Sequence, residues 1–177
     1  MNRIDILLKQ DRKLFHTRDL ELLWQISNKR TLYSALGRYV KKGVLIPIYR
    51  SFYSVVPINK LDPVELGTVA LHHYSYLSCE TILAKNGIIF QKIEPFTFCS
   101  AKNRRIQIGN YSYLSRQLAD KYLFHTSGIV NTGRHLEATS DRAIADMLYF
   151  NPRYHFDNAQ NIDWDQVTRT RKEIGYI

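Results

Sequence analysis

The sequence predicts an α+β fold in two parts, and three observations support this prediction. The chain has 177 residues, which lies between one and two ordinary domains, and 45% of them are hydrophobic, enough for a packed core. Helical and strand-like hydrophobic spacings are mixed along the chain. The spacing breaks at residues 58–61, after which Asp62-Pro63-Val64-Glu65 supplies the cap, first-turn proline and acid of a new helix. We therefore expect one part over residues 1–58 and a second over residues 62–177.

Two short helices are predicted at the start of the first part. Three apolar positions fit an amphipathic helix from Arg3 to Gln10: Ile4, Leu7 and Leu8. Thr17 is a suitable cap for the second helix. Asp19 and Glu21 lie in its first turn, where the positive end of the helix dipole favours negative charge. We expect its buried stripe to consist of Leu20, Leu23 and Trp24.

A third helix is predicted from Asn28 to Lys42, with Ser27 as its cap and Gly43 as the left-handed residue that ends it. Apolar side chains recur at a helical spacing that places them on one face: Leu32, Ala35, Leu36, Tyr39 and Val40. The opposite face holds cationic and small residues: Arg30, Ser34, Gly37, Arg38 and Lys41. We therefore expect a helix that is buried on one side and open on the other.

Two short antiparallel strands are predicted after this helix. The β-prone runs 44–48 and 52–56 flank Tyr49-Arg50-Ser51, which would form a basic tip. Pro47 lacks an amide donor and therefore favours an edge strand. The resulting order of helix, helix, turn, helix, strand, strand is that of a winged helix-turn-helix.

Positive charge is concentrated in this first part. Through Lys60 there are twelve Lys and Arg against four Asp and Glu, a net charge of +8, whereas the remainder has thirteen against twelve, a net charge of +1. This asymmetry is expected if the first part alone binds a polyanion, here double-stranded DNA at an operator or promoter.

The geometry of a winged helix-turn-helix assigns roles to particular side chains. Residues near the start of the third helix reach base edges, and cations elsewhere pair with phosphates. We expect five residues near the groove: Asn28, Lys29, Arg30, Tyr33 and Ser34. We expect four on backbone phosphates: Arg38, Lys41, Lys42 and Arg50. Any one of these cations alone is more often a solvated surface charge, but the whole set together with a basic wing tip favours DNA binding. Gly37 on the same face would permit close approach of the helix to DNA.

The second part is predicted to mix helices and strands. A helix follows Asp62, and Ser78 is expected to cap another that ends near Gly87. Strands are expected over residues 95–100, 105–108 and 111–114, with Gly109-Asn110 as a hairpin turn, and further strands over 122–125, 129–130 and 134–137. The last two helices would run from about Ser140 to Phe150 and from about Trp164 to Ile174.

Three segments resemble one known family. LFHTRDLELLWQISNKRTLYSALGRYVKKGVLIPIYRSFYSVVP resembles the winged-helix domain of AbiEi-type antitoxins, the transcriptional regulators of type IV toxin-antitoxin systems. YSYLSCETILAKNGII and ATSDRAIADMLYFNPRYHF resemble the second, antitoxin-like domain of that family, although Ser140 stands where the family often has proline. The resemblance implies a bacterial DNA-binding repressor of its own operon that opposes a nucleotidyltransferase-like toxin.

No catalytic residue, metal ligand or cofactor is predicted. The six histidines lack ligand spacing, and no Gly-rich phosphate loop, G-x-S-x-G or H-E-x-x-H motif occurs. Cys79 and Cys99 are expected to be reduced thiols, with Cys79 a buried structural one. The longest apolar runs fall short of a bilayer span and the N-terminus is charged, which predicts a cytoplasmic protein that does not associate with membranes.

Two other functions remain as alternatives. A metal-dependent nuclease would need clustered carboxylates and a lysine, and the candidates are scattered: Glu94, Asp120 and Lys121. A protein-interaction module would use an aromatic patch: Tyr111, Tyr113, Tyr122 and Phe124. Helix-turn-helix proteins often form homodimers on palindromic operators, but the sequence contains no coiled-coil heptads to support one.

Overall fold

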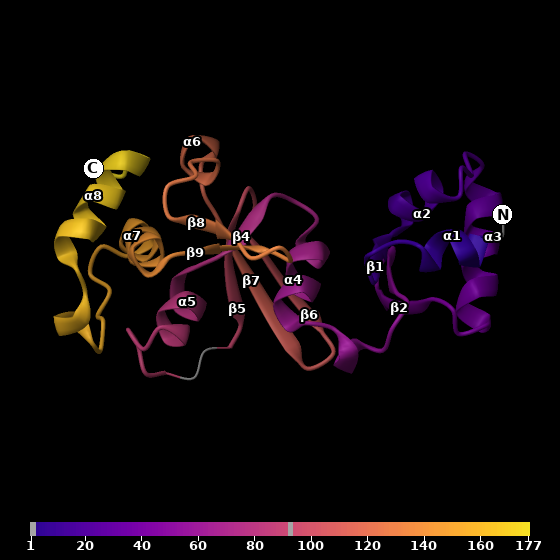
Figure 1. The fold of residues 1–177 in the computed structure, drawn as a ribbon, viewed down its shortest axis with the longest axis horizontal. Helices are drawn as coiled ribbons and strands as arrows, with labels where there is room; N and C mark the ends of the chain where they lie inside the picture. The colour runs from indigo at the N-terminus through magenta and orange to yellow at the C-terminus, as the bar shows by residue number, and fades with distance from the viewer. Residues whose placement is uncertain (1–2, 92–93) are drawn as a thin grey trace. The chain divides into compact units, whose positions relative to one another are not determined.

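The computed structural model describes residues 3–91 and 94–177, and within them eight α-helices and two β-sheets alternate along the chain (Figure 1). The fold is therefore mixed α+β. The chain divides into two compact units, Met1–Asp62 and Pro63–Ile177. No helix of the described residues has both the length and the apolar character needed to cross a membrane.

The N-terminal unit combines three helices with a three-stranded antiparallel sheet (Figure 1). Its elements in order are α1 (Arg3–Leu8), β1 (Leu14–His16), α2 (Thr17–Leu23), α3 (Lys29–Lys41), β2 (Ile46–Tyr49), β3 (Phe52–Ser54) and the 3-10 helix η1 (Ile58–Lys60). The strand order is β1-β3-β2, so β2, which contains Pro47, is an edge strand as predicted. The sheet pairs the chain before α2 with the hairpin that follows α3.

The hydrophobic core of this unit is formed by all three helices together with β1 and the residue before β2. Its buried members are Leu7, Phe15, Leu20, Trp24, Ile26, Leu32, Ala35, Leu36 and Leu45. The predicted stripe of α2 is confirmed, because Leu20 and Trp24 are buried and Leu23 packs against the core. Leu8, by contrast, is exposed, so the apolar face of α1 is narrower than its sequence spacing indicates.

Strand β1, over residues 14–16, was not predicted from the sequence, and it pairs with β3. Two local predictions in the N-terminal unit were wrong. His16, not Thr17, is the N-cap residue of α2, and its backbone N–H donates to Asp19 Oδ2 at 2.7 Å. The first strand of the hairpin begins at Ile46, because the backbone N–H groups of residues 43–45 bond back to the end of α3.

The C-terminal unit is a six-stranded mixed sheet with helices on both faces (Figure 1). Its elements are α4 (Pro63–Leu71), β4 (Ser75–Leu77), α5 (Cys79–Lys85), β5 (Phe96–Ser100), β6 (Arg104–Ile108), β7 (Tyr111–Gln117), α6 (Asp120–Leu123), β8 (Ile129–Asn131), β9 (Leu136–Ala138), α7 (Ser140–Phe150), the 3-10 helix η2 (Ala159–Asn161) and α8 (Trp164–Ile174). The strand order is β6-β7-β5-β4-β9-β8. The β6–β7 hairpin turns at Gly109-Asn110, as predicted.

Helix α4 covers one face of this sheet, while α5 and α7 cover the other and α8 packs on α7 (Figure 1). Gly67 of α4 allows a close approach, because a Cβ there would lie 2.4 Å from the ring of Tyr113. Helix α7 runs over the predicted residues, and Thr139 caps it by accepting from the Arg142 backbone N–H.

Two predictions in this unit were wrong. Residues 122–125 are not a strand; they include the end of α6. Ser78 stands at the N-cap position of α5, but its side chain makes no cap hydrogen bond. Its hydroxyl donates to Asp146 Oδ2, a buried carboxylate oxygen on α7, at 2.8 Å.

Candidate nucleic-acid interface

Helix α3 starts one residue later than predicted, and its capping residue differs. Asn28 is the N-cap: its Oδ1 accepts from the backbone N–H of Thr31 at 3.0 Å and from the Thr31 hydroxyl at 3.3 Å. Ser27, the predicted cap, therefore lies outside the helix. Asn and Ser are equally good caps, so the local sequence alone did not distinguish the two positions.

The end of α3 is fixed as predicted by Gly43, whose φ is +69°. The backbone N–H of Val44 donates to the carbonyl of Tyr39, and that of Gly43 donates to the carbonyl of Val40. This pair of bonds is the Schellman motif, which requires a left-handed residue at the position of Gly43. The helix is thus defined at both ends by side-chain and backbone contacts of its own segment.

One face of α3 is buried and the other is open, in agreement with the hydrophobic spacing. Leu32, Ala35 and Leu36 are at most 2% exposed, and Tyr39 packs against Trp24 with ring centroids 5.1 Å apart. The remaining face carries eight of the nine predicted DNA-binding residues, all exposed: Asn28, Lys29, Arg30, Tyr33, Ser34, Arg38, Lys41 and Lys42. Tyr33 stands out among them because 56% of a large aromatic residue faces solvent.

The ninth predicted residue, Arg50, is exposed in the turn between β2 and β3. Ser51 beside it has a φ of +57°, which allows the two strands to reverse over Arg50-Ser51. Tyr49, at the end of β2, is 48% exposed. The carbonyl of Ser51 accepts from the Thr17 backbone N–H at 2.8 Å, so the start of α2 supports the turn.

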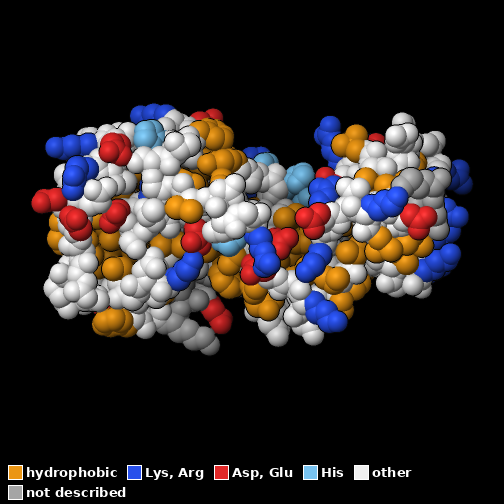
Figure 2. Space-filling model, viewed as in Figure 1, with side chains coloured by type: hydrophobic (Ala, Val, Ile, Leu, Met, Phe, Trp, Pro, Cys, Tyr) orange, Lys and Arg blue, Asp and Glu red, His pale blue; other side chains and the backbone are white. Residues whose placement is uncertain are grey.

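No acidic residue occurs in the chain segment that carries this surface. The sequence contains no Asp or Glu between Glu21 and Asp62, a stretch that includes all of α3, β2 and β3. Within the described residues, none of its six cations forms an ion pair: Lys29, Arg30, Arg38, Lys41, Lys42 and Arg50. Figure 2 shows basic side chains along the edge of this unit where Figure 1 places α3. The local potential is therefore positive.

Gly37 lies in the middle of the open face. A Cβ built at this position would meet nothing within 4 Å, so no packing contact explains the absence of a side chain. Glycine inside a helix costs stability relative to alanine. The position is thus locally unfavourable for the fold, and it leaves the backbone accessible on the face that carries the cations.

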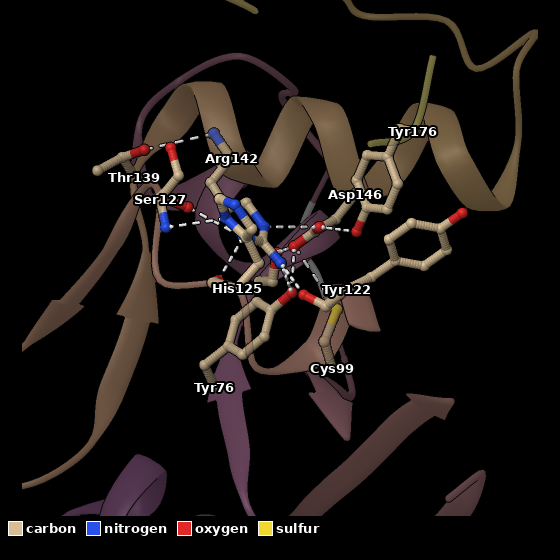
Figure 3. A network of polar contacts seen from close by, with 10 residues as sticks. Tyr76, Cys99, Tyr122, His125, Ser127, Thr139, Arg142, Asp146 and Tyr176 are labelled. Carbon is tan, nitrogen blue, oxygen red and sulfur yellow. Dashed lines mark hydrogen bonds and ion pairs between the residues drawn. The ribbon is translucent and has the colours of Figure 1, made fainter. Parts of the chain in front are cut away.

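A second polar cluster, which the sequence did not predict, lies in the core of the C-terminal unit (Figure 3). Arg142 and Asp146 are one turn apart on α7, are both 0% exposed, and are joined by a bond of 2.9 Å between Nε and Oδ1. The other four donors of the guanidinium are also used. They bond to the Tyr76 hydroxyl and to the backbone carbonyls of Tyr122, His125 and Ser127.

Asp146 connects the same cluster to the sheet and to the end of the chain (Figure 3). It accepts from the hydroxyls of Ser78 and Tyr76, and from that of Tyr176 at 2.7 Å. Burial opposes the charge of the guanidinium, but Asp146, Tyr76 and Tyr176 together outweigh it and raise the pKa of Arg142. The cluster is therefore a charge-balanced, hydrogen-bonded support for α7. The feature of the sequence that could have indicated this cluster is the pair Arg142 and Asp146, a basic and an acidic residue four positions apart within an apolar helix.

The carboxylates of the nuclease alternative are kept apart by the fold. Glu94 lies just before β5, separated from it by Pro95, whereas Asp120 and Lys121 lie in α6, which follows β7. Because β5 and β7 run parallel, these residues lie beyond opposite ends of the two strands. Within residues 3–91 and 94–177, no three His, Cys, Asp or Glu side chains are grouped so that they could hold a metal ion.

The aromatic patch of the interaction alternative is divided in the same way. Tyr113 is fully buried, and its hydroxyl donates to the Pro63 carbonyl at 2.8 Å, so it is not a surface residue. Tyr111 lies beside Phe96, while the exposed Phe124 lies against Tyr74 with ring centroids 5.0 Å apart. The four residues do not form one surface.

Cys79 and Cys99 are both buried free thiols.

Comparison with known proteins adds no assignment. No family model matches the chain, and no curated protein is significantly similar to it.

Proposed function

We propose that the N-terminal unit is a winged helix-turn-helix that binds double-stranded DNA, and that the protein is a transcriptional regulator. In this assignment α2 and α3 are the two helices of the helix-turn-helix, α3 is the recognition helix, and the β2–β3 hairpin is the wing. The observation that carries the proposal is the surface of α3: an exposed face with cations at both ends, no acidic residue and no ion pair to any residue that the structure describes.

The geometry of α3 supports a division of roles. Lys29 and Arg30 stand in its first turn, where a recognition helix meets base edges, whereas Lys41 and Lys42 stand at its end. Arg50 at the hairpin tip extends the cationic surface beyond the helix. Arg38, Lys41, Lys42 and Arg50 are therefore assigned to phosphates, and the residues of the first turns to the groove.

The resemblance of three segments to AbiEi-type antitoxins extends the proposal. On that basis the protein represses its own operon in a bacterial cytoplasm and counters a nucleotidyltransferase-like toxin. It does so by binding, without a catalytic step of its own. The C-terminal unit, which contains the α7 segment of the resemblance, is the part assigned to antitoxic activity.

The proposal is tested by titrating a duplex from the region upstream of the gene for this chain, with a scrambled duplex of the same length as competitor. We expect preferential binding of the upstream duplex, and repression of a reporter placed behind it. Equal binding of both duplexes would overturn the assignment as a regulator. Incubation with supercoiled plasmid and magnesium or manganese provides the second arm, because nicking that a chelator abolishes would identify a nuclease instead.

The antitoxin assignment has a separate test. A nucleotidyltransferase-like gene beside this one would be expressed alone and together with this chain, and growth would be followed. Restored growth on co-expression is expected. Unchanged growth inhibition would overturn the antitoxic role while leaving DNA binding in place.

A further inference from the structure

The C-terminal unit has a hollow that is lined by basic and polar side chains. Its volume is about 330 Å³, at the lower end of the range of small-molecule sites in proteins. The lining comes from α4, from the residues at the start of β4 and from the turn between β8 and β9. It includes the guanidinium of Arg134 and the imidazoles of His73 and His135, and none of the described lining residues is acidic.

Two more cations lie near this hollow. Desolvation and the nearby charges of Lys102 and Arg104 lower the pKa of the His73 imidazole, which is therefore neutral at neutral pH. Arg104 is held in place, because its Nη1 donates to the Leu71 carbonyl at the end of α4 at 3.2 Å. No ion pair joins Lys102, Arg104 or Arg134 to a described acidic residue. Three positive charges thus lie in or near the hollow without a paired carboxylate.

Acidic residues are absent from the chain segments that form the hollow. The sequence has no Asp or Glu in the ranges 66–79, 95–119 and 121–136, which supply the lining and all three cations. Glu137 follows directly, but its carboxylate is bonded to Lys85 Nζ at 2.9 Å. The potential at the hollow is therefore positive, which favours an anionic ligand.

Two partly exposed aromatic rings adjoin the hollow. Tyr74 lines it, and its ring lies against that of Phe124 with 5.0 Å between the centroids. Tyr74 is 36% exposed, and Phe124, which follows the last residue of α6, is 55% exposed. Asp120 and Lys121 in the same helix add no net charge beside Phe124. The fold thus holds a pair of open aromatic rings next to a positive hollow.

The rings and the cations together distinguish among anionic ligands. Cations attract the phosphates of any nucleic acid, but an aromatic side chain can stack only on a base that a duplex does not enclose. Free phosphate would use the cations and leave the rings without a partner. Proteins that bind single strands combine a positive groove with aromatic rings on which bases stack. The hollow and the adjoining aromatic pair match that combination.

We propose that this surface of the C-terminal unit binds a single-stranded nucleic acid, with a base stacked on the Tyr74–Phe124 pair and a phosphate in the hollow beside Arg134. Neither stacking nor phosphate pairing reads the sugar, so the surface suits RNA and DNA alike. Binding here does not depend on duplex binding by α3, because every residue involved lies in the C-terminal unit.

The probes are uridine and deoxyuridine hexanucleotides, with a short duplex and tripolyphosphate as comparison ligands. Each is titrated into the ¹⁵N-labelled full-length chain while backbone amide shifts are followed. We expect the single strands to give saturable shifts around Tyr74, Phe124 and Arg134 at lower concentrations than the duplex or tripolyphosphate. A response to one hexanucleotide alone would support the proposal and assign the surface to RNA or to DNA.

Four results would overturn the proposal. Equal potency of tripolyphosphate would mean that the surface recognises charge alone, and equal potency of the duplex would mean that no open base is required. Shifts confined to α3, or no saturable shift with either hexanucleotide, would mean that this surface does not bind single strands.

A matched pair of variants tests the aromatic ring. Phe124→Leu keeps an apolar side chain and should weaken single-strand binding by about tenfold, as expected for the loss of one base–aromatic stack. Phe90→Leu makes the same change at a ring that is 72% exposed and does not line the hollow, and it should leave the affinity unchanged. Affinities are taken from the shifts of C-terminal residues, so that binding at α3 does not contribute. Equal affinities for Phe124→Leu and the unmodified chain would refute base stacking at this position.

A second pair tests the cation. Arg134→Gln should weaken binding of the single strands and reduce its salt dependence, because one phosphate contact is lost. Arg153→Gln, at another exposed arginine of the C-terminal unit, should change neither the affinity nor the salt dependence. The same result for both arginine variants would refute a phosphate contact in the hollow.

Discussion

Removing two phosphate-binding cations from α3 provides a quantitative test of the proposed interface. Arg38 and Lys41 are three residues apart on the exposed face, and neither forms an ion pair with a described residue. The double change Arg38→Gln and Lys41→Gln therefore removes two charges without breaking a contact that supports the fold. Any loss of DNA binding then reports on the interface itself.

The magnitude follows from counterion release. Four assigned phosphate contacts predict that log K falls with log salt concentration at a slope of about −3.6, because each contact contributes about −0.9. Affinity of the unmodified protein should then fall roughly 150-fold between about 50 and 200 mM salt, and that of the double variant, with a slope of about −1.8, only roughly 12-fold.

The slope is measured by fluorescence anisotropy of a labelled duplex at four or more salt concentrations. The chain offers a matched control, since Arg169 and Lys172 have the same spacing on the exposed side of α8. Arg169→Gln with Lys172→Gln removes the same two charges from the C-terminal unit. We expect the control to retain the slope of the unmodified protein.

Two results would refute this account of the interface. An unchanged slope in the α3 double variant would mean that Arg38 and Lys41 do not contact phosphates. An equal decrease in both double variants would mean that binding depends on total charge, as in non-specific adsorption, and not on the geometry of α3.

Further predictions concern single residues. Arg30→Ala should relax base preference at one position and cost about 1–3 kcal/mol of binding free energy there, whereas Arg50→Ala should weaken binding to all duplexes alike. Competition with singly substituted duplexes distinguishes these two effects, and a loss of selectivity in Arg50→Ala would mean that the roles of Arg30 and Arg50 are exchanged. Gly37→Ala should stabilise the N-terminal unit by about 1 kcal/mol in urea unfolding yet weaken DNA binding, and tighter binding would contradict close approach at this position. Asp146→Ala should cost roughly 3–5 kcal/mol in urea unfolding because it leaves a buried guanidinium unpaired, whereas Lys85→Ala, which breaks an exposed ion pair, should cost at most about 1 kcal/mol; similar losses would mean that the buried pair contributes no more than the surface one.

Local patterns were sufficient to predict α3 and α7. In α3 the apolar residues repeat at a helical spacing and Gly43 ends the run, so its buried face and its end follow from sequence alone. The bounds of α7 were predicted for the same reason. Its two buried charges were not, because Arg and Asp in a helix usually face solvent and only the fold brings Tyr76 to them.

Elements held by distant contacts were not predictable in this way. Strand β1 has three residues, and its partner β3 lies after α3 in the chain, so no local periodicity indicates it. Residues 122–125 are rich in aromatic side chains, which favour strands. They are not a strand, and the carbonyls of Tyr122 and His125 are instead bonded by the Arg142 guanidinium from α7.

The capping role of Asn28 narrows how α3 could read a base sequence. An Asn that recognises adenine uses both its amide oxygen and its amide nitrogen. In this structure Oδ1 of Asn28 already accepts two hydrogen bonds from Thr31, so only the nitrogen remains available unless the cap is broken. Arg30, in the first turn of α3 and exposed, forms no ion pair with a described residue, and its guanidinium matches the paired acceptors of guanine. We therefore expect Arg30 to make the principal base contact, and Asn28→Ser, which preserves a capping oxygen, to leave base preference unchanged.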